Sequence, residues 1–477
     1  MFIFVFIFLL LRLPSFFEPA WYGDEGIYLV LGQAIRKGLT LYTNIHDNKP
    51  PTLYYLAALS QTVFGFRLLL FLWMIPTIYI FYLLSKKLLT PKLARLSVFL
   101  FLIFTSIPLF EGNIANAEIF MLLPTILAVY LIYSFGSVHK SYSIYLISGL
   151  LLGFAFTIKV PVFIEFIFLC LWILFFNFKN LRTTIYQLII FSLAFTLPIL
   201  LYAVYFFFQG AFNDFIFASL LQNFGYLSSW ATGSHSGSAT GSGLITRGIV
   251  LLIFWVFNYL LLRRRLISQN LAFICFWFSA TIFGALLSTR PYPHYLIQII
   301  PPLILLLVSV FNSQTGRLIR TYLVILLLFL GYLFAHYKFY VYPVFSYYQN
   351  FYTHLFSLKK SNYRHYFGSE VNNTYAISAF LNPRLSPSDA IFIWGDSPFI
   401  YVLTNHLPVG RFTVAYHIVD FNQYTPVSDQ LKITFPKIIV YYLQPGRPFP
   451  QLDELISRYY FPLKTFNSAI IYQRYDQ

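Results

Sequence analysis

The chain has 477 residues, of which 58% are hydrophobic and only 10% are charged. A soluble domain carries about 25% charged residues, so this composition, with a mean hydropathy of +0.68, excludes an ordinary soluble protein and predicts a polytopic α-helical membrane protein. The formal net charge of +16 fits cationic cytoplasmic loops rather than a nucleic-acid-binding surface, and two cysteines are too few for a disulfide framework or a four-cysteine metal site.

Hydrophobic stretches of about the length that crosses a bilayer recur from the first residue onward. We predict eleven transmembrane helices, at Phe2–Phe17, Arg67–Ser85, Leu93–Phe110, Glu118–Phe135, Tyr142–Ile158, Val160–Phe176, Thr184–Phe208, Thr246–Leu262, Gln269–Ser288, Tyr292–Phe311 and Thr321–Lys338. The first stretch has no basic segment before it, so it is interpreted as an anchor helix rather than a secretory signal peptide.

Basic residues concentrate in one set of alternate loops, most densely at 86–95 and 263–265. The positive-inside rule makes this set cytoplasmic. The N-terminus is then predicted on the cytoplasmic side of the cell membrane, and everything after Lys338 on the outer side. In this topology all eight acidic residues before Lys338 lie in outer loops or in the outer third of a span: Glu18, Asp24, Glu25, Asp47, Glu111, Glu118, Glu165 and Asp214. Carboxylates gathered on one face of a membrane bundle indicate a functional site there, and simple solvated loops are the alternative.

The sequence predicts a transmembrane domain over 1–338 and an extracytoplasmic domain over 339–477. The first outer loop, 18–66, is long enough for two short helices along the membrane interface, at Gln33–Gly38 and Leu53–Phe64. A second outer loop, 210–243, is rich in glycine and serine and is predicted to be flexible, either as a substrate lid or as slack.

Polar residues, prolines and charges return after Phe339, and short apolar runs alternate there with helical patterns. The runs at Ala390–Trp394, Lys437–Tyr442 and Ala469–Gln473 are interpreted as strands. The patterns at Asn372–Leu381, Pro398–Thr404 and Leu452–Tyr459 are interpreted as helices. This order predicts a small α/β layer, and since it has no phosphate-binding glycine loop and no nucleophile elbow, we assign it no chemistry.

The first outer loop contains the strongest candidate site. It opens with the segment 21–26, which includes Tyr22, Asp24 and Glu25, and it continues with His46-Asp47-Asn48-Lys49-Pro50-Pro51. Desolvation and mutual repulsion can raise the pKa of adjacent carboxylates, and a carboxylate so placed can accept a proton from a hydroxyl. Two prolines restrain the backbone after Lys49, and a fixed cation suits a phosphate. A solvated acidic pair and a simple turn are the alternatives.

Three further motifs lie at predicted outer ends of spans. Glu118 begins the fourth span, where it either caps the helix or contributes to a site. Lys159 occupies a very short turn as a snorkelling lysine or as a clamp for a lipid phosphate, with Glu165 as its potential partner. Arg290 and His294 share one outer face, where either could hold phosphate or play a structural role.

No metal-ligand spacing is present among the nine histidines, so no metal site is assigned. His46 beside Asp47 is a weak signal for a divalent cation such as Mg²⁺ or Mn²⁺, and metal dependence is left open.

In order along the chain, these motifs form a recognisable series. Gly-Asp-Glu and Lys-Pro-Pro bound the first outer loop, Asn-Ala-Glu precedes the fourth span, Gly-Leu-Leu-Leu-Gly and Lys-Val-Pro mark the fifth, and a late His-Tyr precedes Pro-Pro. Over 1–338 this series resembles the GT-C glycosyltransferases of family 39, which include protein O-mannosyltransferases and lipid A aminoarabinose transferases, and it is most similar to their bacterial branch. The tail resembles the small α/β domains that many of them carry.

The resemblance implies an inverting transferase that uses a polyprenyl-phosphate-linked sugar on the extracytoplasmic face. By analogy Asp24 would be the general base, Glu25 would shape the same site and Lys49 would bind the donor phosphate. Glu118 would line the pocket and Lys159 would contact the lipid phosphate. The family's arginine contacts have no clear counterpart in this sequence, and Arg290 would be the candidate for that role. The acceptor can be a glycan, a lipid or a protein.

Two other classes of function compete with this hypothesis. A transporter or flippase of lipid-linked sugars would place ionisable residues at mid-membrane and usually has repeated halves, whereas this chain keeps its acids toward one face and shows no evident repeat. A catalytically inactive scaffold is disfavoured by the presence of Asp24 and Lys49.

Overall fold

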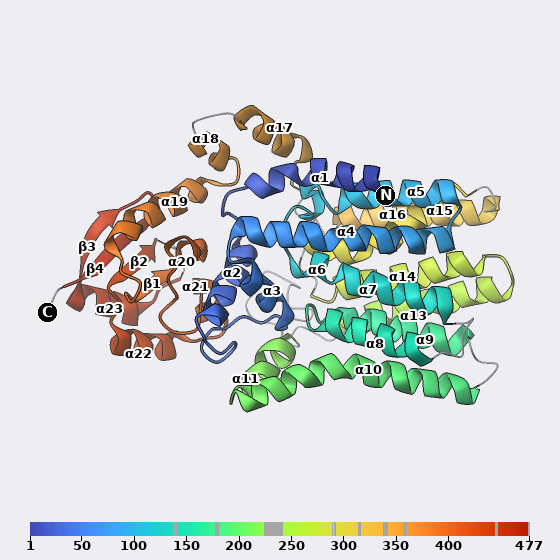
Figure 1. Ribbon diagram of the computed structural model, residues 1–477, viewed down its shortest axis with the longest axis horizontal. Helices are drawn as coiled ribbons and strands as arrows, with labels where there is room; N and C mark the ends of the chain where they lie inside the picture. The colour runs from blue at the N-terminus through green and yellow to red at the C-terminus, as the bar shows by residue number, and fades with distance from the viewer. Residues whose placement is uncertain are drawn as a thin grey trace. The chain divides into compact units, whose positions relative to one another are not determined.

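The computed structural model describes residues 1–136, 142–176, 181–223, 242–288, 290, 292–312, 316–336, 342–355, 360–443 and 447–475. Every predicted span overlaps a helix (Figure 1). The elements up to residue 336 are α1 (Phe2–Phe17), α2 (Gly23–Arg36), α3 (Thr52–Ser60), α4 (Val63–Leu88), α5 (Pro91–Phe104), η1 (Pro108–Phe110), α6 (Ala117–Phe120), α7 (Leu122–Phe135), α8 (Tyr142–Phe156), α9 (Val162–Phe176), α10 (Leu181–Phe208), α11 (Phe212–Ile216), the π-helical η3 (Phe217–Leu221), α13 (Ser242–Arg263), α14 (Gln269–Ala285), η4 (Pro293–Ile299), α15 (Ile300–Ser309) and α16 (Arg317–His336).

Four helical segments in the described part of the chain are long and apolar enough to cross a membrane: Val63–Leu88, Ala117–Phe135, Leu181–Phe208 and Gly243–Arg263. Several shorter apolar helices accompany them. The helical, membrane-type character of the chain is therefore confirmed, whereas the number of eleven spans and their orientation stay predictions. The Gly/Ser-rich stretch of the second outer loop, 224–241, lies outside the described residues.

The described chain forms two compact units. Unit 1 consists of Met1–Leu13, Leu69–Tyr205 and Ser219–Val344, and unit 2 consists of Pro14–Leu68, Phe206–Ala218 and Phe345–Gln477. Unit 2 thus joins the first outer loop to the C-terminal region. The division into domains 1–338 and 339–477 stays a prediction.

Small residues allow close helix packing in unit 1. A Cβ atom at Gly149 would lie 2.4 Å from the Phe191 carbonyl oxygen, and one at Gly153 would lie 2.1 Å from that of Phe195. The Gly-Leu-Leu-Leu-Gly motif therefore lets α8 approach the backbone of α10, as small residues four apart do in membrane helices.

A buried arginine organises the turn that precedes α6. The Arg12 guanidinium donates hydrogen bonds to the carbonyl oxygens of Thr105, Gly112 and Asn113, at 3.2, 2.5 and 3.1 Å. Because buried carbonyl groups need partners, Arg12 compensates for the irregular backbone between η1 and α6, and so fixes the segment that carries Glu111 and Glu118.

The start of the first outer loop in unit 2 differs from the prediction. A helix over Gln33–Gly38 is wrong, since α2 begins at Gly23 and ends at Arg36. Two glycines interrupt the helical pattern of the sequence here. A Cβ atom at Gly26 would lie 2.8 Å from Pro398, and one at Gly32 would lie 2.6 Å from the Ala58 nitrogen. They are close-packing positions inside a helix, whereas sequence alone suggests breaks. The predicted Leu53–Phe64 helix is α3, which ends at Ser60.

The C-terminal part of unit 2 contains a four-stranded sheet of order β1-β2-β4-β3 (Figure 1). Its elements are α17 (Val344–His354), α18 (Lys360–His365), α19 (Ser369–Leu381), η5 (Asn382–Arg384), β1 (Ile391–Trp394), α20 (Phe399–Thr404), α21 (Ala415–Asp420), α22 (Tyr424–Thr434), β2 (Ile438–Tyr442), α23 (Pro450–Tyr459), β3 (Tyr460–Thr465) and β4 (Ala469–Arg474). β1 and β2 are parallel, with Ile391 opposite Ile438, and β4 is antiparallel to β2 and to β3.

The predicted small α/β layer is confirmed, and its three predicted strands correspond to β1, β2 and β4. The prediction missed β3, which contains Pro462 and lies at the edge of the sheet, where proline is tolerated. Alternate strand residues enter two cores, with Trp394 on one face and Ile393 on the other. Val30 of α2 belongs to the second core, so the helix that carries Asp24 is packed into the C-terminal region.

Candidate active site

Asp24 and Lys49, which are 25 positions apart, meet in unit 2. Asp24 lies in the first turn of α2, and Lys49 precedes the two prolines that lead into α3. The Lys49 Nζ lies 3.3 Å from the Asp24 Oδ2, with side chains about 17% and 28% exposed. The fold therefore brings the Asp24 carboxylate and the Lys49 ammonium together, and both groups remain partly accessible to solvent.

The surroundings of Lys49 hold its backbone and its ammonium group in place. The Tyr42 hydroxyl donates to the Lys49 carbonyl oxygen at 2.8 Å, and the Lys49 N–H donates to the Tyr54 hydroxyl at 3.0 Å. The ammonium lies 4.9 Å from the Tyr28 ring centroid, a cation–π distance. Tyr28 also donates from its hydroxyl to Asp24 Oδ2 at 3.0 Å, because it lies one helical turn after Asp24.

Asp47 is the buried counterpart of Asp24. Its Oδ2 accepts a hydrogen bond from the Tyr54 hydroxyl at 2.8 Å and lies 3.9 Å from Lys49 Nζ. Burial, followed by the charge of Asp47, raises the pKa of Tyr54 well above its ordinary value, so this tyrosine stays a proton donor. We call Lys49, Asp24, Asp47, Tyr28 and Tyr54 the Lys49 cluster.

The C-terminal region adds a histidine that the sequence analysis missed. His417 of α21 is buried, and its Nε2 lies 3.7 Å from Asp47 Oδ1. Burial is the main cause that lowers the pKa of His417 below its usual value. His46, part of the candidate site in the first outer loop, is also buried, with its ring against Phe412 and Phe421 at centroid distances of 5.4 and 5.6 Å. Tyr22 is half-buried before α2 and lies edge-on to Trp21.

Glu25 has a different environment from Asp24. Arg67 donates two hydrogen bonds to the Glu25 carboxylate, from Nε at 2.9 Å and from Nη2 at 2.5 Å, and both side chains are fully buried. The adjacent carboxylates of the motif therefore do not form one acidic pair, since each has its own cation. This corrects the expectation that Asp24 and Glu25 act on each other.

The network around Arg67 extends to Glu18. Arg67 Nη1 donates to the carbonyl oxygens of Ser15 and Glu18, at 2.8 and 3.1 Å, and Nη2 lies 3.7 Å from the Glu18 carboxylate. Trp21 and Tyr347 also donate to that carboxylate. We call Arg67, Glu25, Glu18, Ser15 and Tyr347 the Arg67 cluster. Its many fixed hydrogen bonds indicate a structural role.

In unit 1, Glu118 and Lys159 form a second acid–cation site. Lys159 Nζ lies 2.6 Å from Glu118 Oε1 and 4.8 Å from the Tyr295 ring centroid. His294 is buried, with Nδ1 at 2.5 Å from Glu111 Oε2 and Nε2 at 3.9 Å from Glu118 Oε1. Glu118 does lie in the first turn of α6, but it is also paired with a cation.

Two expectations about the remaining residues need correction or stay open. Glu165 does not pair with Lys159: its carboxylate accepts hydrogen bonds from Trp277 Nε1 at 3.0 Å and from Gln298 Nε2 at 3.1 Å. Arg290 is half-buried, and its proposed contact with phosphate stays a prediction.

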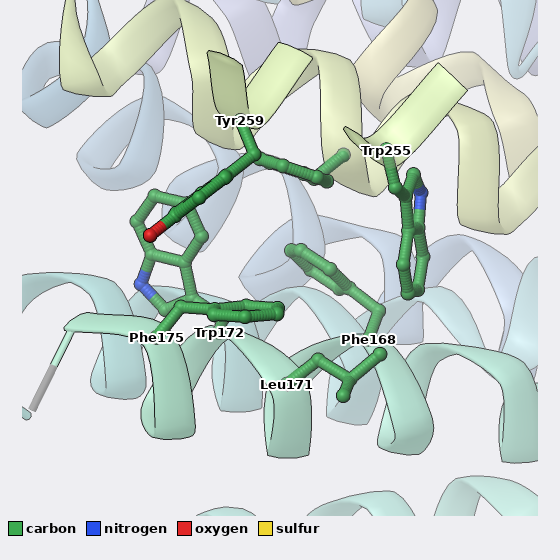
Figure 2. A pocket seen from close by; sticks show the side chains of 7 residues that line it. Phe168, Leu171, Trp172, Phe175, Trp255 and Tyr259 are labelled. Carbon is green, nitrogen blue, oxygen red and sulfur yellow. The ribbon is translucent and has the colours of Figure 1, made fainter. Parts of the chain in front are cut away.

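Among the described residues, two cavities that lie outside these clusters can be compared with them. One, between α9, α13 and α14, has a volume of only about 10 Å³ and is lined by aromatic and leucine side chains such as Trp172, Trp255 and Tyr259 (Figure 2). It has no charged lining residue, so we assign it no chemistry. The other is in unit 2, has a volume of about 230 Å³ and is lined by both polar and apolar side chains. We call it the polar cavity, because it contains the charged side chains Glu370 and Asp396.

Metal binding is not decided by the geometry. Within the described residues, no group of three or more His, Cys, Asp and Glu side chains is close enough to hold a metal ion. The weak signal from His46 and Asp47 therefore gains no third ligand from this part of the chain, and metal dependence stays open.

Residues 48–202, which include Lys49, Glu118 and Lys159, match the family model described as dolichyl-phosphate-mannose-protein mannosyltransferase. The chain is also similar to the crystal structure of ArnT from Cupriavidus metallidurans bound to undecaprenyl phosphate, with 12% identity, a TM-score of 0.56, and coverage of 98% of this chain and 97% of that chain. The fold is the GT-C fold. The resemblance to GT-C glycosyltransferases that the sequence motifs indicate is thereby confirmed.

A second GT-C protein, the oligosaccharyltransferase of Archaeoglobus fulgidus, is more distantly similar. It shows 14% identity and a TM-score of 0.43, with 99% of this chain and 73% of that chain covered, and nothing about the site rests on it. No curated protein matches the chain.

Sequence analysis did not single out Arg67, Tyr28 or His417 as residues of the site. Arg67 carried a signal, since a lone arginine at the start of an apolar span needs a buried acidic partner. Tyr28 becomes evident once a helix is placed from Gly23, because it lies four residues after Asp24. His417 carried none, since nothing in an isolated histidine indicates which distant loop it will contact.

Proposed function

We propose that the chain is an inverting glycosyltransferase that moves a sugar from a polyprenyl-phosphate-linked donor to an acceptor hydroxyl on the extracytoplasmic face of a cell membrane. Asp24 is the general base, Lys49 binds the donor phosphate, and Lys159, held by Glu118, contacts the lipid phosphate. The mannosyltransferase family match over 48–202 and the undecaprenyl phosphate bound to the similar ArnT structure support the lipid-phosphate donor.

The observation that carries this proposal is the 3.3 Å contact between Lys49 Nζ and Asp24 Oδ2, with both groups partly exposed. A departing phosphate gains negative charge as the sugar–phosphate bond breaks, so a cation held nearby stabilises the transition state. A carboxylate at hydrogen-bond distance from the acceptor hydroxyl takes up its proton. When Lys49 turns to a phosphate, Asp24 loses its cationic partner and becomes a better proton acceptor.

The exposure of the carboxylates supports a single displacement, which inverts the anomeric centre. A retaining mechanism needs two accessible carboxylates, one of them as nucleophile. In unit 2, Glu25 is fully buried against Arg67 and Asp47 is buried beneath Tyr54, whereas the Asp24 side chain is about 28% exposed. Among these three carboxylates of the first outer loop, only that of Asp24 is accessible, which suits one base and no covalent intermediate.

Mass spectrometry of cell-envelope glycans tests the proposal without knowledge of the substrate. We compare cells that lack the gene with cells that carry the wild-type chain, Asp24→Asn or Asp389→Asn. Asp389 pairs with Lys437 at 2.7 Å in the C-terminal region and serves as the matched control for loss of a paired aspartate. A product one sugar heavier should disappear in the null and fall by about 10²–10⁴-fold in Asp24→Asn, while Asp389→Asn retains it.

Wild-type amounts of product with Asp24→Asn, at equal protein level, would remove Asp24 from the mechanism. Unchanged glycans in the null, together with a changed distribution of lipid-linked sugar between the two leaflets, would favour the transporter hypothesis instead.

A further inference from the structure

The polar cavity of unit 2 is lined by none of the residues that have a role in the proposed mechanism. Its volume is about 230 Å³, far more than the roughly 10–15 Å³ that a single water requires. Trp21 and Gly23 form one wall, at the start of α2, and residues of α19, the loop after β1, and β2 form the other. The first outer loop and the C-terminal region build this cavity together.

The polar part of the lining is acidic and carries hydroxyl groups, beside apolar residues such as Val371 and Phe399. Glu370 and Asp396 contribute carboxylates, and the hydroxyls of Thr374 and Ser397 lie 3.1 Å apart. The described residues that line the cavity include no lysine or arginine, although Arg447 pairs with Asp396 from outside the lining. Such a surface accepts hydrogen bonds from a neutral polyhydroxylated ligand, and the Glu370 carboxylate disfavours a phosphate or a carboxylate.

Both carboxylates are held in position by neighbouring groups. Glu370 Oε2 accepts from Asn373 Nδ2 at 3.1 Å and from Ser468 Oγ at 2.5 Å. Asp396 accepts from the Tyr416 N–H at 3.1 Å and from Arg447. Because a carboxylate can accept several hydrogen bonds, each of them keeps acceptor capacity for a ligand in an orientation that is already fixed.

The cavity also contains aromatic surface. Trp21 is held by its hydrogen bond from Nε1 to Glu18 at 2.8 Å, and Tyr442 lies on the opposite wall. Burial is the main cause that raises the pKa of Tyr442 above its ordinary value, so its hydroxyl stays neutral. Rigid aromatic side chains beside fixed hydrogen-bond acceptors suit a sugar ring, which presents apolar C–H faces and a rim of hydroxyls.

The cavity lies next to the candidate base. Gly23 lines it and Asp24 is the next residue, so their Cα atoms are about 3.8 Å apart. The packing of Gly26 against Pro398, which is also a lining residue, fixes α2 to this part of the C-terminal region. A ligand in the cavity is therefore held at a constant position relative to the first turn of α2.

We propose that this cavity is the acceptor subsite and that the acceptor is a neutral carbohydrate rather than a protein side chain. The assignment rests on the proposed function, because it gives Asp24 a hydroxyl to deprotonate. It also gives the C-terminal region a chemical role, as one wall of the acceptor site.

Binding to the full-length protein tests this assignment without a transfer assay. Saturation-transfer NMR on the protein in lipid nanodiscs, free of sugar-based detergent, compares three probes: methyl glucoside, glucose 6-phosphate and a short unphosphorylated Ser/Thr peptide. Methyl glucoside should give a signal that glucose 6-phosphate and the peptide do not give. Glu370→Gln should weaken methyl glucoside binding by on the order of tenfold, the worth of one charge-assisted hydrogen bond.

Two further variants make the result decisive. Ser397→Leu fills the cavity and should abolish the signal, and Glu454→Gln, which changes an exposed glutamate paired with Arg458 on α23, should leave it unchanged. Any of three results would overturn the assignment. The peptide could bind in place of the sugar, or glucose 6-phosphate could bind as well as methyl glucoside. Sugar binding could also be unaffected by both Glu370→Gln and Ser397→Leu in folded protein.

The same assay separates this assignment from the proposed function. Asp24→Asn should keep methyl glucoside binding while it loses transfer. If Asp24→Asn retained transfer, Asp24 would not be the general base, but the acceptor subsite would stand. If cavity variants bound sugar normally and still lost transfer, the acceptor subsite alone would be refuted.

Discussion

Asp24 and Glu25 are adjacent in one helical turn, yet they belong to two very different regions. Glu25 enters the Arg67 cluster, where Arg67 donates to its carboxylate and to two carbonyl oxygens without exposure to solvent. Asp24 enters the Lys49 cluster, where the ammonium lies 3.3 Å from one carboxylate and 3.9 Å from another. The first region is fully buried and has many fixed hydrogen bonds, whereas Lys49 and Asp24 in the second are partly exposed to solvent.

The comparison shows why an acidic pair in a sequence is an ambiguous signal. Arginine presents a planar fork that satisfies a buried carboxylate from two sides, whereas the lysine ammonium is a compact charge that can exchange partners. A cluster that must bind and release a phosphate needs the second kind of cation. A cluster that anchors the start of α2 needs the first.

Removal of the Arg67 guanidinium should have the largest effect. Arg67→Met leaves the buried Glu25 carboxylate and two carbonyl oxygens without their partner, which should destabilise the protein by about 3–5 kcal/mol. Thermal unfolding in detergent, followed by tryptophan fluorescence, measures the loss. Arg67→Lys keeps the charge but not the fork and should fall between wild type and Arg67→Met. An unfolding midpoint equal to that of the wild type would show that the Arg67 cluster is not structural.

The matching change in the other region should affect binding rather than folding. Lys49→Ala removes a partly exposed ammonium, so the unfolding midpoint should change little, while affinity for undecaprenyl phosphate should fall by about 10–100-fold, equivalent to about 1.4–2.8 kcal/mol. Thermophoresis of the protein in nanodiscs with this lipid measures the affinity, with Lys432→Ala, at an exposed position of α22, as the control. Equal affinity in Lys49→Ala and Lys432→Ala would contradict phosphate binding at Lys49.

Local chemistry explains what the sequence could predict. Apolar runs locate the long helices and the strands β1, β2 and β4, because such runs are typical of membrane-type helices and of buried strands. The sequence motifs also singled out Asp24 and Lys49 as the acid and the cation of one candidate site in the first outer loop. The separate environment of Glu25 could not be foreseen, because it depends on where the Arg67 guanidinium lies after folding. The polar cavity depends equally on contacts between segments more than 300 positions apart.

His417 should make the Lys49 region sensitive to pH. Its pKa is lowered mainly by burial, although Asp47, Asp24 and Asp420 favour the proton and Lys49 opposes it. An unfolded histidine binds a proton below about pH 6.5, whereas folded His417 does so only at lower pH. The unfolded state thus carries more protons in this window, and stability falls as pH decreases.

His417→Gln removes this contribution while it keeps a polar side chain. Its unfolding midpoint should decline less steeply than that of the wild type between pH 7 and pH 5, and a variant at the exposed His365 of α18 should follow the wild type. Parallel curves for His417→Gln and the wild type would mean that His417 has the same proton affinity in both states.

The smallest effect is expected where a charge pair faces solvent. Arg411 Nη1 lies 3.8 Å from Asp214 Oδ1, with side chains about 35% and 40% exposed, and exposed pairs of this kind contribute only about 0–1 kcal/mol. Arg411→Gln keeps the backbone contact in which the Arg411 carbonyl accepts from the His46 N–H at 2.8 Å. The unfolding midpoint should therefore shift only slightly, and less still at high salt, since ions screen exposed charges. A loss as large as that of Arg67→Met would mean that exposure does not separate structural from replaceable ion pairs here, and the contrast between the two regions would fail.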